Sequence, residues 1–100
     1  MKFSSKDWKI KRFEKARARG KKYTAILENK ETGKTRRVNF GAIKKDGTPY
    51  EQYEDSTGLG LYSKYDHKDK ERRRRYRLRH IVFLKKGFIS PASLSYKFLW

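Results

Sequence analysis

The sequence predicts an α+β fold in which a small antiparallel sheet of two to three strands is followed by a basic helix and a short C-terminal helix. Segments 22–28 and 35–41 are rich in the β-branched and aromatic residues that are typical of strands. An arginine-rich stretch that follows acidic residues indicates the first helix, and Ser90-Pro91 indicates the second. The 100-residue chain is long enough for one small basic domain, residues 1–100.

The first predicted strand covers residues 8–13, where apolar and basic side chains alternate. Trp8 and Ile10 would lie on one face and the neighbouring lysines on the other, as in a half-buried strand. The alternative is a helix that the preceding serines cap and that extends to Arg19. The alternation favours the strand, and the basic connection that follows it has Gly20 as a turn residue.

Segments 22–28 and 35–41 are expected to form a hairpin, because the polar loop 29–34 between them offers Gly33 for a positive φ. In this hairpin the apolar side chains of both strands share one face: Tyr23, Ala25, Leu27, Val38 and Phe40. Arg36 falls on the same, buried side of the register, close to the turn.

Residues 43–65 predict a long loop or insertion, because Asp-Gly and Thr-Pro dipeptides near its start mark turns. Its large side chains could attach it to the core: Tyr50, Tyr53, Leu59, Leu61, Tyr62 and Tyr65. Loops of this length are often functional.

Residues 66–86 predict a helix with Asp66 or Asp69 as its N-cap. The face expected to pack on the core holds Tyr76, His80, Phe83 and Leu84, widened by Leu78 and Ile81. The C-terminal signals are Lys85, Lys86 and Gly87. The first half of this helix, ERRRRYR, is basic on every side and therefore needs a partner surface.

Residues 90–100 predict a short helix with Ser90 as N-cap and Pro91 at its first position. Leu94, Phe98 and Leu99 form an apolar stripe along it. We expect the Phe-Leu-Trp sequence that follows the helix to dock on the core, because exposed large apolar side chains invite aggregation.

Several classes of protein are excluded by composition. The chain has no Cys, so disulfide scaffolds and Cys-based zinc sites or nucleophiles are ruled out. It has no apolar run of the length that a membrane span needs, and no apolar signal core in its first ten residues. We therefore expect neither a membrane partner nor secretion.

The formal net charge is +17, from 28 Lys/Arg against 11 Asp/Glu, and it is unevenly distributed. The basic N-terminal segment, residues 1–22, and residues 68–86 carry most of the excess, while residues 46–66 between them are acidic. A chain with this charge is expected to meet a polyanion, either nucleic acid or an acidic protein surface.

The arginines of the predicted first helix are candidates for phosphate binding, because guanidinium groups bind phosphate in a planar, bidentate way. Asn and Gln, which commonly read bases beside Arg, are sparse here, so we expect binding without sequence preference. A solvated basic face is the alternative. The predicted nucleic-acid-binding residues are Lys9, Lys11, Arg12, Arg17, Arg19, Lys21, Lys22, Arg72, Arg73, Arg74, Arg75, Arg77 and Arg79.

No catalytic residue, metal site or cofactor is predicted. His67 and His80 are too few for a zinc site, and a nuclease would need a carboxylate cluster for metal or another paired base. Four rings could stack on bases or belong to the core: Tyr62, Tyr65, Tyr76 and His80. For Tyr76 we favour the core.

Several short motifs resemble an uncharacterised family of short basic proteins encoded by large double-stranded DNA viruses of algae and protists. The motifs are Lys21-Lys22-Tyr23, Phe40-Gly41-Ala42, HKDKERR from His67 through Arg73 with Tyr76, Arg79-His80, Leu94-Ser95 and Leu99-Trp100. The resemblance covers residues 21–42 and 60–100. Residues 43–59 look like an insertion relative to the family, and the chain stops at Trp100, where relatives continue.

The resemblance implies a viral origin and a role in the virion, and it names no activity. Combined with the charge, it predicts a non-enzymatic, virion-associated protein that binds the phosphates of DNA or RNA without sequence specificity. The alternative is a minor capsid (cement) protein that bridges capsid subunits; a third hypothesis is a ribosome-associated RNA-binding protein. The expected location is the virion, or the host cytoplasm or nucleus during infection.

Overall fold

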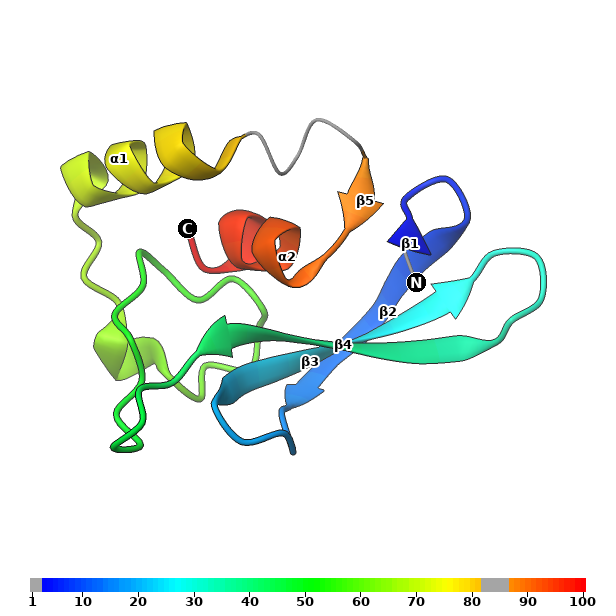
Figure 1. Cartoon of the computed structure of the whole chain (residues 1–100), viewed down its shortest axis with the longest axis horizontal. Helices are drawn as coiled ribbons and strands as arrows, with labels where there is room; N and C mark the ends of the chain where they lie inside the picture. The colour runs from blue at the N-terminus through cyan, green and yellow to red at the C-terminus, as the bar shows by residue number, and fades with distance from the viewer. Residues whose placement is uncertain (1–2, 82–86) are drawn as a thin grey trace.

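The computed structural model describes residues 3–81 and 87–100. Its elements in chain order are β1 (Phe3–Ser4), β2 (Trp8–Lys15), β3 (Lys21–Asn29), β4 (Thr35–Ala42), the 3₁₀ helix η1 (Ser63–Tyr65), α1 (Lys70–His80), β5 (Phe88–Ile89) and α2 (Pro91–Phe98). The three-stranded antiparallel sheet has the order β2-β3-β4, and β1 pairs with β5 in a second, two-stranded sheet (Figure 1). The predicted α+β class is confirmed.

The strand predicted at residues 8–13 is confirmed as β2, which pairs antiparallel with β3. Ile10 lies opposite Leu27, and the register shifts between Ile10 and Arg12. The alternative of a helix reaching Arg19 is wrong, because β2 continues to Lys15 along the edge of β3.

The predicted hairpin and its register are confirmed. Tyr23 pairs with Phe40 and Ala25 with Val38, and these side chains are buried together. Arg36 lies opposite Leu27 on that side and close to the turn, as expected, but its side chain is exposed.

The outer face of the central strand is also covered, which the sequence did not predict. Thr24 and Ile26 are buried there. On the flanking strands Arg12 and Arg37 both pair with Glu14, at 2.8 and 3.0 Å. The register places Arg12 and Arg37 beside Ile26, so their long side chains cover it.

Helix α2 completes the core and is confirmed as predicted. Ser90 caps it in a capping box with Ser93, and Leu94 and Leu99 are buried against the sheet. The Phe98 ring meets Phe13 of β2 edge-on, with ring centroids 4.7 Å apart. As Figure 1 shows, α2 lies between the three-stranded sheet and α1.

Helix α1 is shorter than the predicted 66–86. It begins at Lys70 after the N-cap Asp69, because Asp66 is held in a bridge to Gln52 instead. It ends at His80, and the predicted end at residues 82–86 lies outside the described residues. Leu78 and Ile81 are exposed, so the expectation that they widen a core-facing side is wrong.

Residues 43–62 have no regular strand or helix among them, but hydrogen bonds attach them to the rest of the molecule. The amide of Tyr53 donates to the backbone oxygen of Leu99, and the Tyr62 ring packs against Tyr23. The expected attachment to the core therefore holds for Tyr62. It is wrong for Tyr50, Leu59 and Leu61, which are exposed.

Candidate nucleic-acid interface

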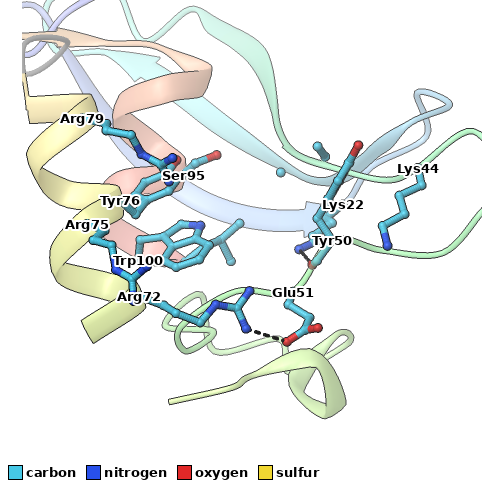
Figure 2. A pocket seen from close by; sticks show the side chains of 13 residues that line it. Lys22, Lys44, Tyr50, Glu51, Arg72, Arg75, Tyr76, Arg79, Ser95 and Trp100 are labelled. Carbon is cyan, nitrogen blue, oxygen red and sulfur yellow. Dashed lines mark hydrogen bonds and ion pairs between the residues drawn. The ribbon is translucent and has the colours of Figure 1, made fainter. Parts of the chain in front are cut away.

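A cavity of about 790 Å³ opens between α1 and the segment that follows β4 (Figure 2). We call it the arginine groove. It is lined by Arg72, Arg75, Tyr76 and Arg79 of α1, by Gly41, Ala42, Lys44, Tyr50 and Glu51, and by Lys22, Ser95, Leu99 and Trp100. Arg72, Arg75 and Arg79 stand on one wall, and Lys44 and Tyr50 stand on the other.

Helical geometry explains why three arginines line the groove. Arg72, Arg75 and Arg79 are spaced three and four residues apart, so they lie along one face of α1. Arg72 pairs with Glu51 across the groove at 3.0 Å, and Arg75 lies 3.7 Å from Glu71. Such exposed ion pairs are weak and can give way to a phosphate.

Arg79 completes this wall. Its side chain makes no ion pair or hydrogen bond with any described residue and is exposed at the cavity. Arg74, by contrast, does not line the groove and pairs with Glu71 at 2.6 Å. That contact lowers the pKa of Glu71 and raises that of Arg74.

Arg73 and Arg77, on the opposite side of α1, serve the fold. Both donate hydrogen bonds to the backbone oxygen of Trp100, Arg73 at 2.8 Å and Arg77 at 3.1 and 3.2 Å. Their guanidinium groups also lie over the rings of Tyr53 and Tyr96, at 4.6 and 4.8 Å. They hold α1 against the C-terminal segment, so phosphate contacts are not their main role.

Stacked rings form the inner wall of the groove. Tyr76 lies between His80 and Trp100, with centroid distances of 4.0 and 4.2 Å and nearly parallel planes. Burial raises the pKa of the Tyr76 hydroxyl. Because both faces of its ring are occupied, Tyr76 belongs to the packed structure, as favoured from the sequence, and offers no face to a base.

His67 orients the start of α1. Its amide donates to the Gln52 backbone oxygen at 2.9 Å, and its Nδ1 accepts from the amide of Asp69, the helix cap, at 2.9 Å. Its ring lies 5.0 Å from that of Trp100. Burial and, secondarily, Arg72 lower the pKa of His67, so the neutral imidazole needed for this hydrogen bond is favoured.

Lys22 was predicted to bind nucleic acid, and the structure contradicts this. The residue is 2% exposed, and its Nζ donates to the Tyr50 backbone oxygen at 2.6 Å and to Gln52 Oε1 at 2.8 Å. Desolvation lowers its pKa to about 8, against the opposing effect of Asp55 and Asp66. Lys22 therefore anchors the segment that carries Tyr50, and its ammonium is unavailable to phosphate.

The glycine at position 41 makes room for this anchor. Gly41 has a φ of 80°, and a Cβ there would lie 3.0 Å from Cβ of Lys22 and 3.2 Å from Cδ1 of Leu99. Only glycine suits both the backbone and the space.

The predicted basic residues of β2 lie away from the groove. Lys9 and Lys11 pair with Glu28, at 3.7 and 3.4 Å, and Arg12 pairs with Glu14. The sequence left open whether the N-terminal basic segment and the arginines of α1 form one continuous basic patch. None of these three side chains of β2 lines the groove that the α1 arginines line.

The turn between β2 and β3 comes closer to the groove. Arg17 and Arg19 are exposed in this turn, and Lys21 is half-buried at the start of β3. Arg19 lines a second cavity of about 480 Å³ that shares Lys44 with the groove and also contains Lys45. The cations at 44 and 45 were missed from the sequence, where two lysines after a strand resemble an ordinary solvated turn.

Comparison with protein-family models, with curated protein sequences and with solved structures finds no match for this chain. The viral resemblance therefore stays a prediction. Within residues 3–81 and 87–100 there is no helix long and apolar enough to cross a bilayer, and no group of three His, Asp or Glu side chains suited to a metal ion. The function has to be argued from the groove.

Proposed function

We propose that this protein binds nucleic acid through phosphate contacts in the arginine groove, without sequence specificity and without catalysing a reaction. The observation that carries the proposal is the distribution of charge in the cavity. Arg72, Arg75 and Arg79 face Lys44 across it, and among the described residues that line it Glu51 is the one with an acidic side chain. Arginines on a rigid helix are suited to bidentate phosphate contacts.

We expect binding without sequence specificity because the described lining of the groove lacks amide side chains that could read bases. Among the described residues that line it there is no Asn or Gln, the side chains that pair with adenine. Its cations are suited to phosphate oxygens, which are alike in every sequence. Following the viral resemblance, we place this binding in the virion, or in the host cytoplasm or nucleus during infection.

A salt titration tests the proposal. For a protein that makes several phosphate contacts, the logarithm of the association constant falls linearly with that of salt concentration, by about 0.9 per contact on duplex DNA. We expect a steep slope for the wild type, measured by fluorescence anisotropy. The absence of binding at low salt would end the proposal.

Variants of α1 locate the contacts. Arg75→Gln and Arg79→Gln should each make the slope shallower by about one contact. Arg74→Gln is the matched control: it removes the same charge from the same helix, but from a side chain outside the groove. If Arg74→Gln reduces the slope as much as Arg79→Gln does, the effect is one of net charge and the groove is not the site.

A second candidate function, a minor capsid protein, is favoured by the exposed apolar side chains of the 43–65 segment. Tyr50, Leu59 and Leu61 are exposed on it, and residues 46–66 are acidic overall. Such a surface suits contact with another protein. Virions emptied of their genome distinguish the two functions: retention in the shell supports the capsid role, and loss with the genome supports nucleic-acid binding.

A further inference from the structure

We propose that the arginine groove takes single-stranded nucleic acid, with one base stacked on the ring of Tyr50 and the adjoining phosphates on Arg75 and Arg79. The inference rests on the proposed function and specifies its substrate class. It is carried by an exposed aromatic ring whose backbone is anchored, inside a basic cavity.

The shape of the site favours a single strand. A recess of about 790 Å³ is in the size range of pockets that enclose small ligands, which is large enough for a nucleotide. In a duplex the bases are paired and stacked inside, so none can enter a recess without the free-energy cost of extrusion. A single strand presents its bases unpaired and can insert one while its backbone follows the arginines.

Tyr50 is the one groove ring suited to stacking. It is 51% exposed, whereas Tyr76 and Trp100 stack on each other. Its amide donates to the Ala42 backbone oxygen at 3.3 Å, and its own backbone oxygen accepts from Lys22 Nζ at 2.6 Å. The backbone is thus fixed on both sides while the ring stays accessible.

The charges around Tyr50 are placed for the phosphates next to a stacked base. Lys44 Nζ lies 5.4 Å from the centroid of the Tyr50 ring, and Arg72 is tied to the adjacent Glu51. Arg75 and Arg79 stand on the opposite wall (Figure 2). Stacking on an aromatic ring does not distinguish bases, so this mode agrees with binding that lacks sequence preference.

The test compares labelled oligothymidylate of about 12 nucleotides with a duplex of the same length, at one salt concentration, by fluorescence anisotropy of the full chain. We expect the single strand to bind more tightly. Tyr50→Ala should weaken single-strand binding about five- to a hundredfold and leave duplex binding unchanged, and Tyr50→Phe should bind like the wild type.

Tyr65→Ala is the matched control. Tyr65 also has a lysine over its ring, Lys64 at 5.2 Å, but it lies outside the groove lining, so its removal should change neither affinity. Tyr50→Ala overturns the inference if it weakens both nucleic acids alike or neither. Tighter binding of the duplex than of the single strand also overturns it, and both results leave the proposed function standing. If neither the single strand nor the duplex binds at low salt, both the inference and the proposed function are wrong.

Tryptophan fluorescence gives a readout that needs no change at Tyr50. The chain has two tryptophans: Trp100 lines the groove, and Trp8 is buried in β2 against Phe3. In the variant Trp8→Phe the emission comes from Trp100 alone. We expect the oligothymidylate to change this emission at saturation more than the duplex does; an equal or larger effect of the duplex would overturn the inference.

Discussion

Lys22 gives the sharpest test of the interior beneath the groove. Its pKa is about 8 in the folded chain, against an ordinary value of 10.5, because burial disfavours the charged form. Between pH 8 and pH 10 the unfolded chain keeps this proton while the folded chain loses it. Stability therefore rises with pH across this window, because the unfolded state binds more protons.

The magnitude follows from the two pKa values. Integrating the difference in bound protons from pH 8 to pH 10 gives an increase in unfolding free energy of about 2 kcal/mol. Lys22→Met keeps the length of the side chain and removes the titrating group, so this increase should be lost. Tyr23, whose pKa burial raises, lowers stability near and above pH 10, but it does so equally in both proteins.

Urea denaturation followed by circular dichroism at pH 8 and pH 10 measures the effect. The wild type should gain about 2 kcal/mol relative to Lys22→Met on going from the lower to the higher pH. Identical pH dependence of the two proteins would show that the ammonium is not held in the interior. The account of how Tyr50 is anchored would then be wrong.

Three further predictions concern the elements that shape the groove. Gly41→Ala should lower the unfolding free energy by about 2 kcal/mol or more, because the added Cβ meets Lys22 and the backbone has a positive φ. Gly33→Ala, at a φ of 72° with open space around it, should lower it by about 1 kcal/mol. Equal losses for the two variants in urea denaturation would refute the steric argument. Ser90→Ala should cost about 1 kcal/mol, seen as a lower urea midpoint, because it removes the side-chain acceptor of the α2 capping box; an unchanged midpoint would contradict the capping role. Tyr76→Leu removes two stacked ring pairs and should cost about 1–3 kcal/mol, which in a chain of this size is a drop in Tm of roughly 4–20 °C; an unchanged Tm would mean that the stack adds nothing.

Local patterns in the sequence were enough to predict the three-stranded sheet and α2, but not the two-stranded pairing of β1 with β5. The alternation around Tyr23 and Phe40 determines which side chains are buried, and Ser90-Pro91 is a strong signal for the start of a helix. In both cases the deciding interactions lie between neighbouring residues or across one short turn.

The errors come from contacts between distant segments. Asp66 is a plausible helix cap in the sequence, but in the structure its carboxylate accepts a hydrogen bond from the side chain of Gln52, fourteen positions earlier. Lys22 looked like one more surface cation, and only the placement of Tyr50 and Gln52 shows that its ammonium is buried.

The candidate site was predicted only in part, for the same reason. The arginines of α1 were expected to bind phosphate, but the sequence could not show that Arg73 and Arg77 turn toward Trp100 while Arg72, Arg75 and Arg79 line a cavity. Helical spacing separates these two sets. Which set faces solvent depends on where the C-terminal segment docks.

The central claim, that nucleic acid binds in the arginine groove, is tested most directly by mapping amide chemical shifts with ¹⁵N-labelled protein and a short oligonucleotide. We predict that the largest changes fall on Gly41, Lys44, Tyr50, Arg75 and Arg79, the residues that line the groove. Changes concentrated instead on β2, at Lys9, Lys11 and Arg12, would place the nucleic acid on the sheet and contradict the account.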